Sequence, residues 1–154
     1  MTNQIYRVIL YIVKKREAYI IQTIDRNEIA KDINAKISGL GRNIRTNWEL
    51  GFEEGQVITL EKQESWTDGG DFTVCNDCPV EYNFEIENEA PCHVVDYSNK
   101  EEATALGAED CENEKEVLLP AGTKLEVVYG EREDDKDDMG FYTVIFRYIE
   151  SEEK

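Results

Sequence analysis

The sequence lacks any long hydrophobic run. Its longest apolar run extends from Val8 to Val13 and is followed at once by Lys14, Lys15 and Arg16. A membrane-spanning helix needs about 20 consecutive apolar residues, and a secretory signal carries its positive charges before the apolar region rather than after it. We therefore expect a cytoplasmic protein that does not bind membranes.

Histidine is also scarce, since His93 is the only one in the chain of 154 residues. Any catalysis that requires an imidazole base must use His93. This residue stands between Cys92 and an apolar stretch, a position that favours a structural or metal-binding role. The spacing alone does not define a Cys–His nucleophilic pair.

The chain is also poor in positively charged residues. It has 17 Lys and Arg and 34 Asp and Glu, which gives a net charge of −17. Residues 1–48 hold nine Lys and Arg against four acidic residues, whereas residues 49–154 hold eight against thirty. This balance excludes nucleic-acid binding over most of the surface. The acid excess can serve solubility alone, or it can match a target protein with a basic surface or mimic a polyanion. The acidic segment from Glu131 to Asp138 lies between two apolar runs and predicts a solvated hairpin loop.

The N-terminal third predicts a hairpin and a helix. Two β-rich runs between Gln4 and Ile24 indicate the hairpin. Asp25 followed by Glu28 then predicts a helix start. One apolar stripe at spacings of three and four indicates an amphipathic helix: Ile29, Ile33, Ile37, Leu40, Ile44 and Trp48. Gly39 and Gly41 weaken its middle.

The remainder of the chain predicts short strands separated by polar turns. The expected strands are residues 57–60, 72–74, 82–86, 93–95, 116–119, 125–129 and 141–148. We therefore expect a single domain, 1–154, of the α+β class. Its residues 1–50 are basic and form the hairpin and helix, and its residues 51–154 are acidic and β-rich.

The four cysteines are candidate metal ligands. Cys75 and Cys78 form a C-x-x-C pair, Cys92 and Cys111 follow it, and His93 adds an imidazole. Thiolate and imidazole ligands can close a tetrahedral zinc site, but the sequence has no second C-x-x-C pair. Ordinary free thiols and a disulfide remain open alternatives, and disulfides are rare in a reducing cytoplasm.

Three glutamates stand at alternate positions directly before an apolar strand. They are Glu112, Glu114 and Glu116, and Val117 follows them. Alternate side chains of an extended chain lie on one face. Like charges on one face repel unless they are solvated or serve a function. Taken alone, the pattern is typical of a solvated edge strand.

The longer stretch EKEVLLPAGTKL, residues 114–125, resembles the last hairpin of the ADP-ribosyltransferases of the arginine–serine–glutamate class. That family places a Glu-x-Glu pair before an apolar strand, a Pro/Gly turn and a Gly-Thr-Lys strand. The resemblance implies that Glu116 is the catalytic glutamate, which holds the nicotinamide ribose of NAD and stabilises the oxocarbenium-like state. It implies that Glu114 orients or deprotonates an arginine acceptor. Residues 98–113 would meet the target protein.

The resemblance extends upstream with two departures from the family pattern. Ser65-Trp66-Thr67 is similar to the family's Ser-Thr-Ser, with Trp66 in place of the middle Thr. By this resemblance Ser65 would position the catalytic glutamate, and Thr67 would contact NAD. Tyr6-Arg7 resembles the family's Tyr-Arg-Gly without its Gly, so Arg7 would bind the NAD phosphates. Arg42 is a rival for that role by residue type.

Two functions are expected from these patterns. The first is a small NAD-dependent mono-ADP-ribosyltransferase that modifies a protein side chain, with arginine favoured. The second is an acidic, non-enzymatic interaction or inhibitor protein of phage or bacterial origin, including a degenerate relative of the transferases. In both cases the expected partner is a protein with a basic surface.

Overall fold

A computed structural model describes residues 25–71, 74 and 76–152. The hairpin expected between Gln4 and Ile24, and Arg7 within it, lie outside the described residues. The described strands form one sheet in the order β1-β6-β7-β4-β2-β5-β9-β8-β3. Neighbouring strands run antiparallel, except that β5 and β9 run parallel.

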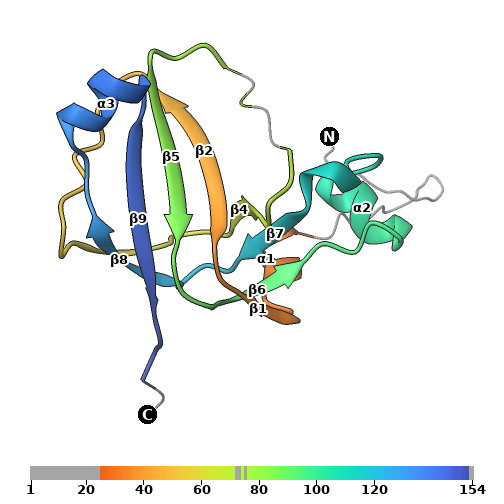
Figure 1. Cartoon of the computed structure of the whole chain (residues 1–154). Helices are drawn as coiled ribbons and strands as arrows, with labels where there is room; N and C mark the ends of the chain where they lie inside the picture. The colour runs from red at the N-terminus through yellow and green to blue at the C-terminus, as the bar shows by residue number, and fades with distance from the viewer. Residues whose placement is uncertain (1–24, 72–73, 75, 153–154) are drawn as a thin grey trace, which may run out of the picture.

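The strands are β1 (Ala35–Ile37), β2 (Leu40–Thr46), β3 (Val57–Thr59), β4 (Glu64–Thr67), β5 (Val80–Ile86), β6 (Ala90–Val94), β7 (Glu116–Leu119), β8 (Lys124–Tyr129) and β9 (Tyr142–Ile149). The helices are α1 (Arg26–Ala30), α2 (Lys100–Leu106), the 3₁₀-helix η1 (Glu112–Glu114) and α3 (Glu133–Met139). Figure 1 shows β2, β5 and β9 side by side with α3 at one end, while α1 and α2 lie at the other side of the molecule near β6 and β7. None of the helices in the described part of the chain has the length and apolar composition needed to span a bilayer.

The amphipathic helix predicted from Ile29 to Trp48 is wrong. Asp25 does cap a helix, because its side chain accepts a hydrogen bond from Asn27 N at 3.0 Å, but this helix, α1, ends at Ala30. The chain then forms β1 and β2. Gly39 makes the turn between them with a φ of 75°, a left-handed conformation that glycine adopts at little cost.

Long-range pairing explains why the helix does not continue. β2 lies between β4 and β5, and its whole length is in register with β5, from Leu40 opposite Ile86 to Thr46 opposite Val80. Sheet hydrogen bonds and burial outweigh a helical period that glycine already weakens. Beyond α1, Leu40 is the one fully buried member of the predicted stripe, whereas Trp48 is 67% exposed.

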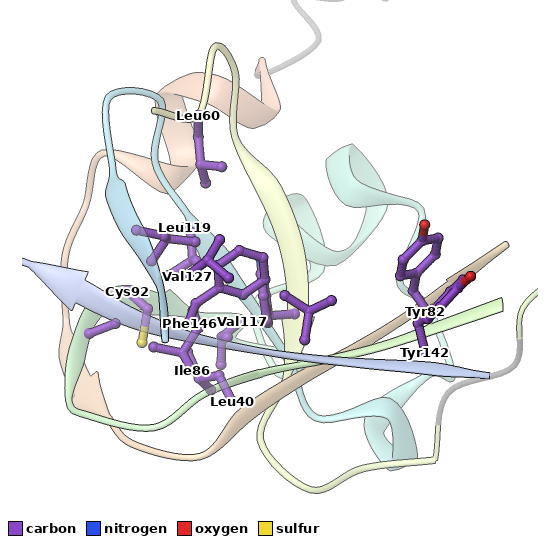
Figure 2. Packing of buried hydrophobic residues seen from close by; sticks show 14 residues of the cluster. Leu40, Leu60, Tyr82, Ile86, Cys92, Val117, Leu119, Val127, Tyr142 and Phe146 are labelled. Atoms are coloured by element: carbon purple, nitrogen blue, oxygen red, sulfur yellow. The ribbon is translucent and has the colours of Figure 1, made fainter. Parts of the chain in front are cut away.

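The main core is built from alternate side chains of the central strands (Figure 2). Its buried members are Leu40, Leu60, Trp66, Tyr82, Ile86, Ala90, Cys92, Val117, Leu119, Leu125, Val127, Tyr142, Val144 and Phe146. Full burial of one large apolar side chain contributes about 1.5–3 kcal/mol. This core therefore fixes β4 and β7, the two strands that carry the candidate catalytic residues.

A smaller cluster covers the opposite face of β7. Leu118 alternates with the two core residues beside it, so its side chain leaves the other face of the strand. There it packs with Ile29 and Ala30 of α1 and with Leu106 of α2; Val95 and Ala108 complete the cluster. The two helices are thus held over the face of β7 that carries Glu116.

Most of the predicted strands are confirmed, and the α+β class with a β-rich C-terminal part is confirmed with them. β3, β5, β6, β7, β8 and β9 correspond to predicted strands. β4 was not predicted. In the segment 72–74, residues 72 and 73 lie outside the described residues, and Val74 is not in a strand.

The segment from Glu131 to Asp138 is mostly exposed and connects two antiparallel strands, as predicted, but it is not an irregular loop, because it contributes most of α3. Three acidic residues in the first turn of α3 interact favourably with the positive end of the helix dipole. Gly140 ends α3 with a φ of 85°. The helix therefore connects the antiparallel strands β8 and β9.

Candidate active site

Ser65 and Glu116 meet on neighbouring strands. β4 and β7 run antiparallel, with Thr67 opposite Glu116 and Ser65 opposite Leu118. Ser65 Oγ donates a hydrogen bond to Glu116 Oε1 at 2.5 Å. The contact that the family resemblance implied is therefore present, and the catalytic role of the two residues stays a prediction.

Arg26 covers this pair from α1. Its Nη2 donates to Glu116 Oε1 at 2.7 Å and to Ser65 Oγ at 2.8 Å, and its Nη1 donates to Leu106 O at 2.8 Å. The side chain of Glu116 is only 11% exposed, while that of Arg26 is 33% exposed. One guanidinium thus connects α1, β4, β7 and the end of α2 around a nearly buried carboxylate.

The backbone of Glu116 is fixed as well. Glu116 N donates to Tyr97 Oη at 2.8 Å, and Glu116 O accepts from Val95 N at 3.2 Å. Burial raises the pKa of Tyr97, the hydrogen bond from Glu116 N opposes this, and the nearby carboxylates of Glu116 and Glu114 add to the net increase. The Tyr97 hydroxyl therefore stays neutral at physiological pH and places the start of β7.

The three glutamates do not share one face of an extended strand, so that prediction is wrong. Glu112 and Glu114 belong to η1, and Lys115 follows in the left-handed region with φ 48° and ψ 50°. Only Glu116 lies in β7. The 3₁₀ turn breaks the alternation on which the prediction depended.

Thr67 holds the end of η1 against β4. Its Oγ1 donates to Glu114 O at 2.6 Å and accepts from Gly70 N at 2.8 Å. A Cβ atom at Gly70 would lie 2.2 Å from Glu114 O, so this approach requires glycine. Thr67 therefore has a structural role, and its predicted contact with NAD stays a prediction.

A groove of about 470 Å³ opens beside Thr67. Its lining consists of Gly39, Gly41, Arg42, Asn43, Thr67, Gly70, Asn83, Phe84, Glu85 and Thr143. This volume lies within the range of about 300–1,000 Å³ that is typical of small-molecule sites. Thr67 is opposite Glu116 in the β4–β7 pair, whereas Ser65, Arg26 and Glu116 themselves are not part of the groove lining.

The groove is lined mainly by uncharged polar groups. Asn43 Nδ2 donates to Asn83 Oδ1 and to Glu81 Oε2. Arg42, the one cation in this lining, is paired with Glu64 Oε1 at 2.6 Å. Two amides, two hydroxyls and the carboxylate of Glu85 suit the hydroxyl groups of a sugar, whereas the groove itself offers little for a phosphate.

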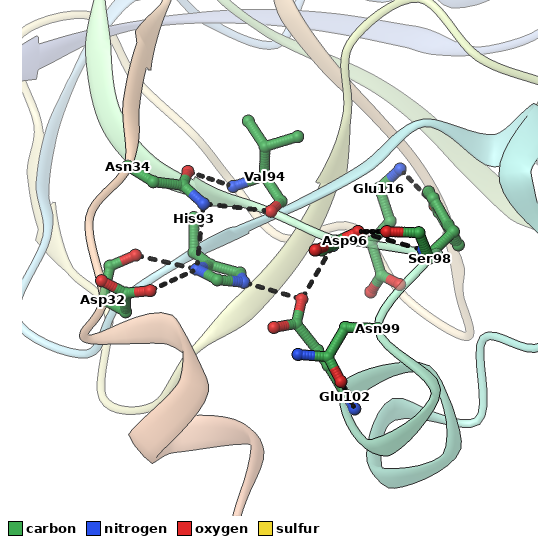
Figure 3. Close-up of polar contacts among 10 residues, drawn as sticks. Asp32, Asn34, His93, Val94, Asp96, Ser98, Asn99, Glu102 and Glu116 are labelled. Atoms are coloured by element: carbon green, nitrogen blue, oxygen red, sulfur yellow. Dashed lines mark hydrogen bonds and ion pairs between the residues drawn. The ribbon is translucent and has the colours of Figure 1, made fainter.

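His93 anchors the segment that precedes η1 (Figure 3). Its Nε2 lies 2.8 Å from Glu102 Oε2, and its Nδ1 lies 2.8 Å from Asp32 O, so both ring nitrogens face acceptors. Burial lowers the pKa of His93, but the hydrogen bonds that the imidazole donates to Glu102 and Asp32, together with the charges of these two residues, outweigh it, and the pKa is raised above its usual value. Glu102 Oε2 also accepts from Asp96 N at 2.8 Å. The imidazole thereby connects β6 with α2 and with Asp32 in the segment after α1.

The predicted four-cysteine zinc site is not supported. In the part of the chain that the structure describes, no group of three or more His, Cys, Asp or Glu could hold a metal ion. Cys75 lies outside the described residues, while Cys78, Cys92 and Cys111 are free thiols. Cys92 is buried in the main core, and His93, as its neighbour on β6, faces the other side of the sheet.

Arg26 and Tyr97 were missed by sequence reasoning. The cationic role was assigned to Arg7, which lies outside the described residues, with Arg42 as its rival. Arg26 directly follows a helix cap, and no local pattern relates it to partners 39 and 90 positions away. Only the tertiary structure brings these residues together.

No protein-family model matches the sequence, and no curated protein matches it either. Among solved structures, the fold is similar to the type III effector XopAI from Xanthomonas axonopodis pv. citri, with a TM-score of 0.48 and 13% identity over 75% of this chain and 46% of that chain. It is also similar to the ADP-ribosyltransferase Vis in complex with the M6 inhibitor, with a TM-score of 0.47 and 15% identity over 76% and 51% of the two chains.

A further similar structure is the C3larvin toxin, an ADP-ribosyltransferase from Paenibacillus larvae, with a TM-score of 0.44 and 10% identity over 79% of this chain and 66% of that chain. The chain spans about half the length of XopAI and Vis. At these identities and scores, the similarity describes the course of the chain at a coarse level and assigns no residue a role.

Proposed function

We propose that the protein is an NAD-dependent ADP-ribosyltransferase that modifies a protein side chain. The observation that carries this proposal is the hydrogen bond between Ser65 and Glu116. It joins two strands whose sequences resemble the serine and glutamate motifs of one enzyme family. A chance resemblance in two separate segments gives no reason for the two residues to meet.

Glu116 would stabilise the positive charge that develops on the ribose as nicotinamide leaves. Fixed placement is what such electrostatic stabilisation needs. Ser65 and the Tyr97 hydroxyl supply it by holding the carboxylate and the backbone of Glu116. The bond between ribose C1′ and the pyridinium nitrogen breaks, and its electron pair leaves with nicotinamide. A nitrogen of the acceptor then bonds to C1′ and loses a proton.

The groove beside Thr67 supports binding of NAD at this position. Its hydroxyl, amide and carboxylate groups suit the two riboses, and Thr67 in its lining is opposite Glu116 on the neighbouring strand. The pyrophosphate requires a cation, and a guanidinium binds phosphate through paired hydrogen bonds. We assign this contact to Arg26, which is partly exposed beside Glu116, with Arg7 as the alternative from the family resemblance.

Arg26 would also have to release Glu116 when NAD binds. The carboxylate is 11% exposed, so the nicotinamide ribose has no direct access to it while the ion pair persists. Exchange of the carboxylate for the pyrophosphate as the partner of Arg26 would expose Glu116 and keep the guanidinium paired. Binding of NAD and opening of the site would then be one event.

The acceptor that we propose is arginine on a target protein with a basic surface. Glu114 stands two residues before Glu116, where the family resemblance places the residue that deprotonates an arginine. The acidic balance of residues 49–154 would attract such a target. Label found only on residue types other than arginine would remove this part of the proposal.

The proposal is tested by incubating the protein with labelled NAD and a cell lysate, and by measuring nicotinamide release and protein labelling. We expect turnover by the wild type and a loss of about 100-fold or more in Glu116→Gln, because the variant removes the stabilising charge. Glu150→Gln is the matched control, since this exposed residue directly after β9 lies outside the groove lining and should leave turnover unchanged. No turnover by the wild type, or equal turnover by Glu116→Gln, would reject the proposed transferase activity.

The second candidate is a non-enzymatic protein that binds a basic target surface. The ion pair that Arg26 forms with Glu116 restricts access to this carboxylate. This ion pair and the excess of acidic residues favour a non-enzymatic protein. Binding of this kind should weaken as salt is added, because exposed charges are screened beyond about 8 Å at physiological ionic strength. A partner recovered equally well at low and high salt would count against it.

A further inference from the structure

The imidazole of His93 lies on the face of the sheet that carries Glu116. His93 is opposite Leu118 in the β6–β7 pair, and directly opposite side chains share one face. Leu118 and Glu116 leave the same face of β7, because they stand two residues apart. The transferase chemistry proposed above makes no use of this imidazole.

The contacts of the ring require two N–H donors. Nε2 of His93 faces Glu102 Oε2, and Nδ1 faces Asp32 O, each at 2.8 Å. Both partners accept hydrogen bonds, and a neutral imidazole has one N–H, whereas the imidazolium has two. The side chain of His93 is 4% exposed and that of Glu102 is 15% exposed, so water does not readily replace a lost bond. The geometry therefore favours the imidazolium, in agreement with the raised pKa of His93.

Three carboxylates from the surrounding elements interact with the charge of His93. Glu102 of α2 faces Nε2, and the exposed carboxylate of Asp32, after α1, lies 3.7 Å from Nδ1. Asp96 follows β6; hydrogen bonds from Ser98 lower the pKa of this carboxyl, and the charge of His93 lowers it further. Deprotonation of His93 would therefore remove the one positive charge that these three groups share.

One oxygen of Glu102 connects the imidazole to the segment that leads to Glu116 (Figure 3). Glu102 Oε2 accepts hydrogen bonds from His93 Nε2 and from Asp96 N, both at 2.8 Å. Tyr97 follows Asp96 directly, and its hydroxyl accepts a hydrogen bond from Glu116 N at 2.8 Å. Asp96 and Tyr97 therefore join Glu102 to the backbone of Glu116.

We propose that His93, as the imidazolium, is a positioning residue for Glu116. It holds Glu102 where one carboxylate oxygen fixes the backbone before Tyr97, and Tyr97 in turn places the start of β7. Loss of the proton weakens the bond to Glu102, because a charge-assisted hydrogen bond is about twice as strong as a neutral one. The placement of Glu116 should therefore follow the protonation of His93. The consequence for catalysis rests on the proposed transferase function, whereas the placement itself does not.

The test is an NMR titration of the ¹⁵N-labelled full chain, without a histidine tag, between about pH 6 and 9. His93 is the only histidine, so its imidazole proton signals need no further assignment. We expect the backbone amide signal of Glu116 to shift with the same midpoint as the imidazole signals. His93→Gln should remove this shift. A Glu116 signal that does not move, or that moves with a different midpoint, would overturn the proposal.

Variants of Glu102 test whether the effect passes through this carboxylate. Glu102→Gln keeps an acceptor oxygen and removes the charge, so both midpoints should move to lower pH together. In Glu102→Ala the imidazole should still titrate, but the Glu116 signal should no longer follow it. Glu89→Ala is the matched control, since this exposed glutamate directly before β6 should leave the coupling intact. A Glu116 signal that still follows the imidazole in Glu102→Ala would overturn the connection through Glu102.

The effect on turnover is measured as the ratio of kcat for the wild type to kcat for His93→Gln. Displacement of a catalytic group by about 1 Å can cost about 100-fold in rate, and we expect a ratio of about tenfold at about pH 6. The ratio should approach one as pH rises through the midpoint of His93, and a ratio that does not change with pH would overturn the catalytic consequence. A protein without turnover whose Glu116 signal follows His93 would reject the transferase and support the positioning. Turnover with a Glu116 signal independent of His93 would do the reverse.

Discussion

Replacing Arg26 with alanine would measure how much the contacts of Arg26 with Glu116 and its neighbours contribute to the free energy of unfolding. The substitution removes hydrogen bonds to Ser65, Glu116 and the Leu106 carbonyl, and it leaves a carboxylate that is 11% exposed without its cation. Removing one partner of a fully buried ion pair costs about 3–5 kcal/mol, whereas exposed pairs contribute about 0–1 kcal/mol. Because the Arg26 side chain is 33% exposed, we expect an intermediate loss of about 2 kcal/mol.

Urea unfolding of Arg26→Ala, Glu116→Gln and the double variant would test this magnitude. Glutamine keeps the shape and removes the charge, so the double variant should recover part of the loss, with a coupling energy of about 1 kcal/mol. Arg132→Ala is the control, since its ion pair with Glu54 is 51% exposed on both sides and should contribute little. A free energy of unfolding for Arg26→Ala within about 0.5 kcal/mol of the wild type, or strictly additive effects, would contradict the reasoning.

Three further predictions concern positions outside the Ser65–Glu116 contact. The pKa of His93 is raised in the folded state, so its contribution to stability is present below the unfolded pKa of about 6.5 and is lost as pH rises through the folded value. Melting temperatures measured between about pH 6 and 9 should therefore fall more steeply in the wild type than in His93→Gln, and parallel curves would contradict the assignment. Gly70→Ala should destabilise the protein by about 2 kcal/mol or more, because its Cβ would meet Glu114 O at 2.2 Å. Gly41→Ala, whose closest contact is 3.8 Å, is the control, and equal urea midpoints for the two variants would disprove the clash. Burial raises the pKa of Cys92 to about 11, so mass spectrometry after alkylation of the folded protein at about pH 8 should find this thiol unmodified; rapid labelling would show that the site opens.

Local pattern was sufficient where strand period and burial agreed. The apolar run after Glu116 ends at Pro120, and the structure has a strand with the predicted bounds, Glu116–Leu119, in which the three apolar residues are all buried. The aromatic and β-branched run at β9 was recognised for the same reason. The helix start at Asp25 was also recognised, because a cap depends on residues within one turn.

Prediction from neighbouring residues failed where pairing with segments far along the chain determined the secondary structure. The apolar stripe from Ile29 to Trp48 fits a helical period, but β2 gains hydrogen bonds from β4 and β5, and these lie far along the chain. β4 is short and was missed because its strand character comes from pairing with β7 and β2. Propensity is a weak preference that such tertiary contacts override.

The sequence by itself indicated two residues of the candidate site and the strand that carries one of them, Glu116. It indicated Ser65 and Glu116 through their resemblance to paired motifs, and it determined the acidic balance on which the prediction of a basic partner rests. Only the tertiary structure decided that Arg26 covers Glu116, and that Trp66 and Ser65 serve opposite faces of one strand. The physical reason is that a motif depends on neighbours within a few residues, whereas an ion pair or a cavity depends on atoms that come together only when the sheet closes.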